Sequence, residues 1–292
     1  ALADRLVNTF KEAQKNPDVA AGVKWYSTAR TRLKKIFGDD TKLFAELLGA
    51  TSARTAVDLN FNFALDAYNQ FKSGAYDALL AKYREGKRKF DVKDVDDYVK
   101  ATKDAEPTRA AFLDWWIEKH NLTPLQSNGK KFGMNSRAVL KVLDGSWRQE
   151  VQGPKTPNFT GNLTGETFEA TIDVWAARML HRLSNEGNPG RWRILPGNET
   201  GVSDADFFIG QSAFRKAADQ LKVKPDALQA ILWFAEKDHW ERNGWTDSKG
   251  AEKSDFNTLL ARTERTEGGR AKLKTAQTEL SFDLGPEDIK KK

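Results

Sequence analysis

Helical periodicity dominates the sequence. Apolar residues recur at three- and four-residue spacings in segments such as 2–15, 56–71 and 76–90, so each segment has one apolar face. The alternation of apolar and polar residues that marks a half-buried strand is almost absent. We therefore predict an all-α fold. At 292 residues, the chain is long enough to form two helical lobes with real hydrophobic cores.

The cysteine count excludes several kinds of site. The chain has no cysteine, which rules out disulfides, thiolate catalysis, Cys-ligated zinc and iron–sulfur clusters. Its three histidines, His120, His181 and His239, show no metal-ligand spacing, so we expect no metal and no cofactor. No apolar run approaches the roughly 18 residues of a membrane span, and the N-terminal segment lacks the apolar core of a signal peptide. We expect no membrane partner and a cytoplasmic location.

The charge of the chain favours an anionic partner. Its formal net charge is +6, which points to nucleic acid before other partners. Basic clusters at 84–89, at Lys130 and Lys131, and at 190–193 are candidate phosphate contacts. The last cluster, which contains Arg191 and Arg193, is the best of the three, because it interleaves arginine with an aromatic residue in a Gly/Pro-rich loop. Each cluster can also be read as a solvated charged face.

A GPKT turn at residues 153–156 separates two helical segments, which makes it a candidate helix–hairpin–helix. Gly153 lets the backbone come close to a partner. The following helix begins near Thr156 and Pro157, and proline is well tolerated in a first helical turn. Free N–H groups at such a helix start can bind a phosphate. The alternative is a corner between two helices that binds no ligand.

An apolar segment follows the turn, and a lone aspartate then lies within TIDVWAAR, residues 171–178. This arrangement resembles the helix–hairpin–helix–Gly/Pro–Asp DNA glycosylase superfamily, the group related to endonuclease III. Members carry Gly-x-Lys-Thr at the hairpin and Val-Asp-x-x-x-x-Arg after the next helix. The matching residues are Gly153, Lys155, Thr156, Ile172, Asp173 and Arg178. The resemblance covers about residues 40–183 and includes Thr55 and Asn60 in the early helix pair.

Three positions depart from the family pattern. Val151 replaces the first hairpin glycine, Ala53 stands where the DNA-inserting residue is often glutamine, and Trp175 stands where histidine is common. The catalytic pair is retained, so the departures bear on DNA engagement and base choice.

The resemblance implies a two-lobed helical fold. We assign residues 40–155, with the hairpin, to one lobe and residues 1–39 with 156–292 to the other. We expect the cleft between the lobes to hold the catalytic pair, and the polar segment 275–292 to be a mobile tail.

The resemblance also implies roles for the catalytic pair. Breaking a base–sugar bond develops positive charge on the sugar, and the carboxylate of Asp173 would stabilise that charge. The amine of Lys155 would attack the sugar carbon and form a Schiff base. Asp173 is also well suited to be the N-cap of a helix over 174–183, which is compatible with the first role. Lys155 could instead contact a phosphate in the hairpin.

Chemistry on a base requires that the base leave the stack and enter a pocket. Trp147, Phe159 and Trp175 lie near the pair in sequence and are candidate pocket walls. The strongly aromatic helix at 224–244 is most simply explained by core packing. Glu236 and Lys237 on this helix could still reach the cleft.

Three functions follow from these residues. The first is a DNA glycosylase with AP-lyase activity, acting as a monomer on double-stranded DNA. The second keeps the fold but is a bacteriophage base-hypermodification transferase that acts on a modified thymine in the host cytoplasm. The third is a non-enzymatic DNA-binding or virion protein, which would not need Lys155 and Asp173.

Overall fold

A computed structural model describes residues 1–52, 55, 57–78, 80–81, 92–103, 111–112, 115, 119, 134–147, 155–184, 204–243 and 260. The regular secondary structure of these residues is helical, with no strand among them, which confirms the predicted all-α class. The predicted tail 275–292 lies outside them. The described residues fall into two compact units, unit 1 within Ala1–Lys35 and Gln149–Leu260 and unit 2 within Ile36–Arg148.

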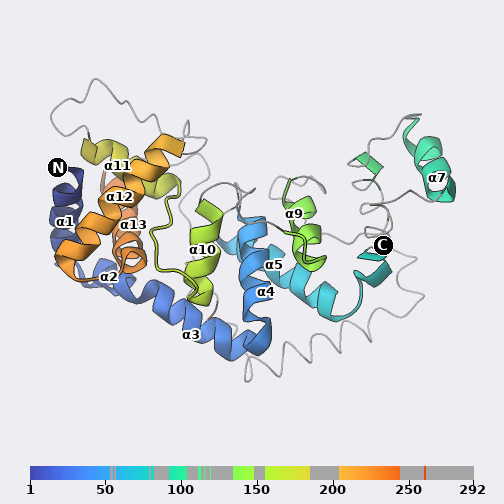
Figure 1. Ribbon diagram of the computed structural model, residues 1–292, viewed down its shortest axis with the longest axis horizontal. Coiled ribbons are helices and arrows are strands. Elements are labelled where there is room, and N and C mark those ends of the chain that lie inside the picture. The colour runs from blue at the N-terminus through green and yellow to red at the C-terminus, as the bar shows by residue number, and fades with distance from the viewer. Residues whose placement is uncertain are drawn as a thin grey trace. The chain divides into compact units, whose positions relative to one another are not determined.

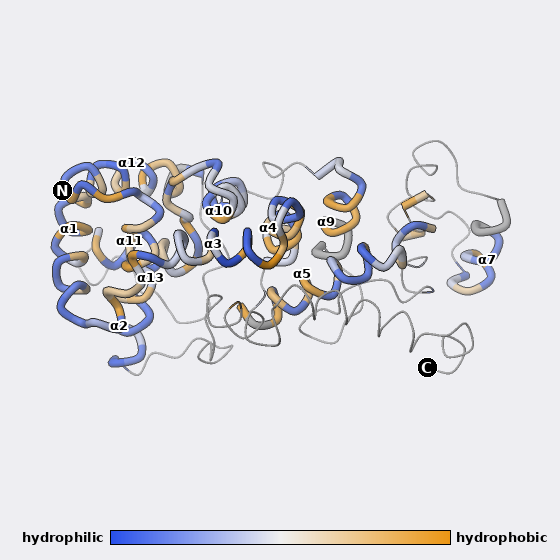
Figure 2. Tube along the Cα trace, turned by 90° about the horizontal axis from the view of Figure 1, so that it is seen from below, coloured by the Kyte–Doolittle hydropathy of each residue, from blue (hydrophilic) through white to orange (hydrophobic). Residues whose placement is uncertain are grey.

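Unit 1 is built from the N-terminal helices together with helices from the second half of the chain (Figure 1). They are α1 (Leu2–Ala13), α2 (Pro17–Ala20), the 3-10 helix η1 (Ala21–Lys24), most of α3 (Trp25–Phe37), α10 (Lys155–Thr164), α11 (Val174–Ser184), α12 (Asp204–Leu221) and α13 (Pro225–Arg242). Along α1 and α12, hydrophilic and hydrophobic stretches alternate as expected for helices with one buried face (Figure 2).

Helix α13 lies at the centre of unit 1. It packs against α1, α11, α12 and η1, and the consecutive residues 228–232 are all buried. A helix covered on several sides has no single apolar face. This position explains why the sequence of α13 is rich in aromatic residues without a clear amphipathic pattern.

A buried polar network joins α3, α10 and α13. The hydroxyl of Tyr26 donates to Thr171 Oγ1 at 2.8 Å, and Asn162 Nδ2 donates to the same oxygen at 3.2 Å. Arg30 Nη1 donates to the Asn162 carbonyl at 2.8 Å and to Asp226 Oδ2 at 3.2 Å. Burial raises the pKa of Asp226, and the hydrogen bond from Arg30 opposes that rise. The network holds the chain just before residue 173.

Unit 2 contains η2 (Gly38–Asp40), α4 (Thr41–Thr51), α5 (Val57–Lys72), α7 (Val92–Thr102) and α9 (Met134–Leu143). Helix α4 packs against α5 and α9. The rings of Phe37 and Phe44 stack with their centroids 3.8 Å apart, and Thr51 Oγ1 donates to Asn60 Oδ1 at 2.5 Å. Within the described part of the chain, no helix is long and apolar enough to cross a membrane.

Gly22 offers a direct test of the packing around α13. A Cβ at this position would lie 2.6 Å from Phe234 Cδ2 and 3.1 Å from Ile231 Cα, so η1 would have to move away from α13. We expect Gly22→Ala to lower the free energy of unfolding by about 1–3 kcal/mol, as overpacking does. Urea denaturation followed by circular dichroism measures the change.

Ala21→Ser at the exposed neighbouring position is the matched control, and it should change stability by less than about 0.5 kcal/mol. Equal stability of Gly22→Ala and the wild type would show that η1 does not approach α13 this closely.

Candidate active site

The segment between α10 and α11 runs back along α10 (Figure 1). Asn162 Nδ2 donates to the carbonyl of Glu169 at 2.7 Å, and Asn158 Nδ2 donates to the carbonyl of Ala170 at 3.0 Å. Asn158 lies about one helical turn before Asn162. The segment therefore advances toward the N-terminal end of α10, where Lys155 is the first residue.

The end of this returning segment is firmly held. Ala170, Thr171 and Ile172 are at most 3% exposed, and Gln211 Nε2 of α12 donates to the Ala170 carbonyl. Thr171 accepts from Tyr26, as described above. These three buried residues, two of them with hydrogen-bond partners, thus set the position of the residue that follows, Asp173.

Asp173 is half-buried, and both of its carboxylate oxygens accept hydrogen bonds. Oδ1 accepts from the backbone N–H of Ala176 at 2.9 Å, which confirms the predicted N-cap of α11. Oδ2 accepts from Trp233 Nε1 of α13 at 3.1 Å. The two hydrogen bonds, from the Ala176 N–H and from the Trp233 indole, hold the carboxylate in one orientation. The position of its negative charge is therefore fixed.

Lys155 is half-buried at the start of α10, and its Nζ lies 5.6 Å from the ring centroid of Phe159. In the described part of the chain, no acidic side chain forms an ion pair with it. This distance makes Phe159, predicted as a pocket wall, a neighbour of Lys155 in space as well as in sequence. Thr156, the next residue of the helix, was predicted to contact DNA, and it is 5% exposed.

Indole rings and cations lie beside Asp173. The rings of Trp175 and Trp240 meet edge to face, with their centroids 5.4 Å apart. The guanidinium of Arg178 lies against both, with Cζ 4.5 and 4.4 Å from the two centroids, and the residue is 3% exposed. Lys237 Nζ is 4.2 Å from the centroid of Trp233 and 5.8 Å from that of Trp175. The predicted residues Trp175 and Arg178 thus belong to one cation–π cluster, in which Arg178 supports Trp175 from a buried position.

Asp173 has a hydrogen-bond partner, Trp233, that sequence reasoning missed. Trp233 hydrogen-bonds Asp173 from 60 positions further along the chain, and the only sign of it was the unusual aromatic content of its helix. Lys237, named from the sequence, does lie beside this indole. Glu236 is 1% exposed, is paired with Arg182, and also accepts a hydrogen bond from Trp240 Nε1 at 3.0 Å.

The structure does not place the remaining predicted residues relative to Lys155 and Asp173. Trp147 is half-buried and belongs to unit 2, whereas Lys155 and Asp173 belong to unit 1. The predicted DNA contacts Gly153, Lys130, Lys131, Arg191 and Arg193 lie outside the described residues. Within the described ranges, no three His, Cys, Asp or Glu side chains are grouped so as to hold a metal ion.

The helix-capping role of Asp173 can be tested separately from the role of its negative charge. Asp173→Ala removes the acceptor for the Ala176 N–H, and we expect it to cost about 1 kcal/mol of unfolding free energy. Asp173→Asn keeps an acceptor oxygen and should lose a few tenths at most, since asparagine caps as well as aspartate. Parallel urea titrations compare the two variants, and equal losses would contradict the capping geometry.

Comparison with known proteins adds one family match. Residues 119–242 match the model of a family of unknown function, DUF7178. The matched region contains Lys155, Asp173 and Trp233, together with helices α10 to α13. No curated protein and no solved structure matches the chain.

Proposed function

We propose that this protein is a DNA glycosylase with AP-lyase activity, acting on a damaged or modified base in double-stranded DNA. The observation that supports this most directly is the return of the segment after α10. It directs Asp173 toward the helix end that begins with Lys155. A nucleophilic amine and a carboxylate at one end of a helix are the two groups that the reaction requires.

In this proposal, Asp173 stabilises the positive charge that develops on the sugar as the base leaves. Its carboxylate is half-buried, so its field is less screened than it would be in bulk water. The hydrogen bonds from Ala176 and Trp233 hold it in one orientation, so little reorganisation is needed during the reaction.

Lys155 is the proposed nucleophile. The lone pair of its neutral Nζ attacks C1′ of the deoxyribose, the C1′–N bond breaks, and its electron pair leaves with the base, which takes up a proton. Nζ then loses a proton, and the C1′–O4′ bond opens, with O4′ taking up a proton, to give the protonated Schiff base. In the lyase step, C2′ of this intermediate loses a proton and the 3′ phosphate leaves.

The base pocket would be walled by aromatic residues close to the pair. Trp175 and Trp233 flank Lys237, and Phe159 lies against Lys155. A flipped base can stack on such rings. The finer architecture belongs to the same proposal: a two-lobed, glycosylase-like fold with a helix–hairpin–helix at the GPKT turn that binds the DNA backbone.

Borohydride trapping tests the proposal. The protein is mixed with labelled duplexes that carry uracil, 5-hydroxymethyluracil, oxidised bases or an abasic site, and borohydride reduces any Schiff base to a stable amine. We expect a covalent protein–DNA band that is lost in Lys155→Ala and kept in Lys216→Ala, a control at an exposed position on α12. Asp173→Asn should slow base release by about 100-fold or more, with folding retained.

Two results would overturn this assignment. A band that is kept in Lys155→Ala but lost in Lys237→Ala would identify Lys237, on α13, as the nucleophile. No band and no base release on any duplex, with DNA binding retained, would exclude the glycosylase. Mass spectrometry of the bases would then separate a modification transferase, which adds mass and leaves the sugar bond intact, from a DNA-binding protein without chemistry.

A further inference from the structure

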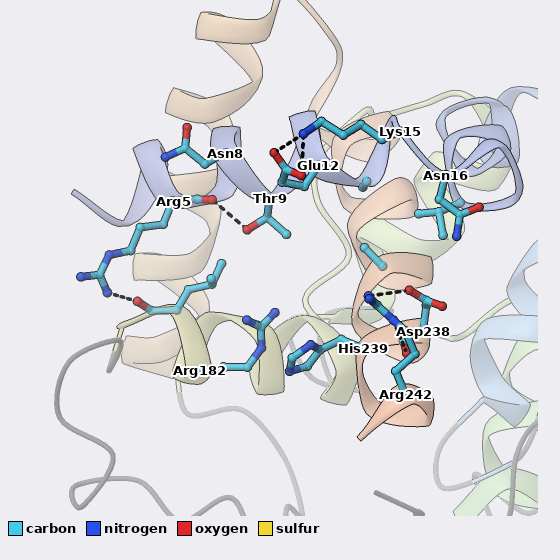
Figure 3. A pocket seen from close by; sticks show the side chains of 14 residues that line it. Arg5, Asn8, Thr9, Glu12, Lys15, Asn16, Arg182, Asp238, His239 and Arg242 are labelled. Carbon is cyan, nitrogen blue, oxygen red and sulfur yellow. Dashed lines mark hydrogen bonds and ion pairs between the residues drawn. The ribbon is translucent and has the colours of Figure 1, made fainter. Parts of the chain in front are cut away.

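Helix α13 carries charged side chains on two of its sides. Asp238, His239 and Arg242 line a groove of about 620 Å³ together with residues of α1 and α11 (Figure 3). In this groove Asp238 and Arg242 form an ion pair at 2.7 Å. Lys237, the residue before Asp238, does not line the groove, and its ammonium faces aromatic rings instead.

Lys237 lies over the indole that holds the candidate catalytic carboxylate. Its Nζ is 4.2 Å from the centroid of the Trp233 ring. The same indole donates from Nε1 to Asp173 Oδ2 at 3.1 Å. Trp233 and Lys237 are four residues apart on α13, so both side chains leave the same face of the helix. One indole therefore contacts a cation with its face and an anion with its N–H.

These two contacts of the indole strengthen each other. An ammonium over the face of an indole is attracted by the electron density of the ring. It draws that density toward itself, so the N–H becomes more positive and a stronger donor to a carboxylate, as in other linked polar contacts. Asp173, Trp233 and Lys237 are all half-buried, where charges are screened less than in bulk water, so solvent does not cancel this coupling.

The other cation of this region contacts different rings. The guanidinium of Arg178 lies against Trp175 and Trp240, as described above. Among the residues that the structure describes, Lys237 is the one cation that lies over the ring of Trp233. A substitution at Lys237 therefore changes the charge on the face of this indole and leaves Arg178 with its own two rings.

We propose that Lys237 is a positioning residue for Asp173 and acts through Trp233. Its ammonium strengthens the hydrogen bond from the indole N–H to Oδ2, and this bond holds the carboxylate more firmly in its orientation. Lys237 thus supports the reaction without contacting the reacting atoms. The consequence for catalysis rests on the function proposed above, whereas the coupling of the three side chains does not.

The coupling is tested without substrate, by NMR of the full chain with ¹⁵N-labelled tryptophan. The Nε1–H resonance of Trp233 is identified by its loss in Trp233→Phe, and its exchange with water reports how well it is hydrogen-bonded. Lys237→Met keeps the apolar stem and removes the charge, and we expect exchange to become about threefold faster or more. Lys237→Arg should restore slow exchange, because a guanidinium also stacks on an indole.

The sign of the change separates the proposed coupling from a simple effect of charge. Removing a positive charge alone would slow hydroxide-catalysed exchange, because the local field would attract fewer hydroxide ions. Faster exchange in Lys237→Met is therefore specific to a weaker hydrogen bond. Lys216→Met, at an exposed position on α12, is the matched control and should leave the exchange of the Trp233 indole unchanged. Circular dichroism checks that each variant is folded.

The consequence for catalysis is measured as the single-turnover rate of base release. Trp233→Phe keeps a ring beside Lys237 but removes the N–H, and it should slow base release about tenfold or more, as loss of a hydrogen bond to a charged group does. Lys237→Met should slow it about threefold in the otherwise wild-type chain and have no further effect in Trp233→Phe. Borohydride trapping through Lys155 should persist in all of these variants.

Two outcomes overturn the proposal. One is indole exchange that is unchanged or slower in Lys237→Met. The other is equal slowing of base release by Lys237→Met with and without the Trp233 N–H, which would mean that Lys237 acts on the substrate directly. A wild type that releases no base would contradict the proposed glycosylase instead, and indole exchange would still decide whether Lys237 strengthens the bond from Trp233 to Asp173.

Discussion

Two asparagine side chains on α10 determine where the candidate catalytic carboxylate lies. The side-chain amides of Asn162 and Asn158 donate to the backbone carbonyls of residues 169 and 170, in place of backbone donors. These bonds hold the irregular segment against α10. Asn162 is fully buried, so its amide has little freedom to bond elsewhere. Residues 167–173 form no regular structure, and the other bonds that hold their backbone are few; among them, the N–H of Thr167 donates to the Gly161 carbonyl at 3.3 Å, and the N–H of Asp226 donates to the Phe168 carbonyl at 2.9 Å.

Buried charge gives unit 1 its second constraint. Arg30 with Asp226 links α3 to α13, and Arg182 with Glu236 links α11 to α13. Removing one partner of such a pair typically costs about 3–5 kcal/mol, although the intact pair adds little to stability. These pairs therefore act mainly to specify how α13 lies, and this position brings Trp233 to Asp173.

Much of this could be predicted from local patterns. The all-α class followed from periodicity, and the cap at Asp173 followed from an aspartate just before an apolar helix. The hydrogen bond from Trp233 could not be predicted, because it joins residues 60 positions apart and depends on how α11 and α13 pack. The burial of Arg178 could not be predicted either, because its contacts with Trp175 and Trp240 depend on the same packing of α11 and α13.

The placement of Lys155 and Asp173 at one end of α10 can be measured directly, because the chain has no cysteine of its own. A protein carrying Lys155→Cys and Asp173→Cys is treated with a short bismaleimide, beside a control carrying Lys155→Cys and Glu166→Cys. The control positions flank the ten-residue helix α10 and lie about 15 Å apart. We expect an intramolecular cross-link in the first pair under conditions that leave the control unlinked. Failure of the first pair to link, or equal linking in both, would contradict a shared site for the lysine and the aspartate.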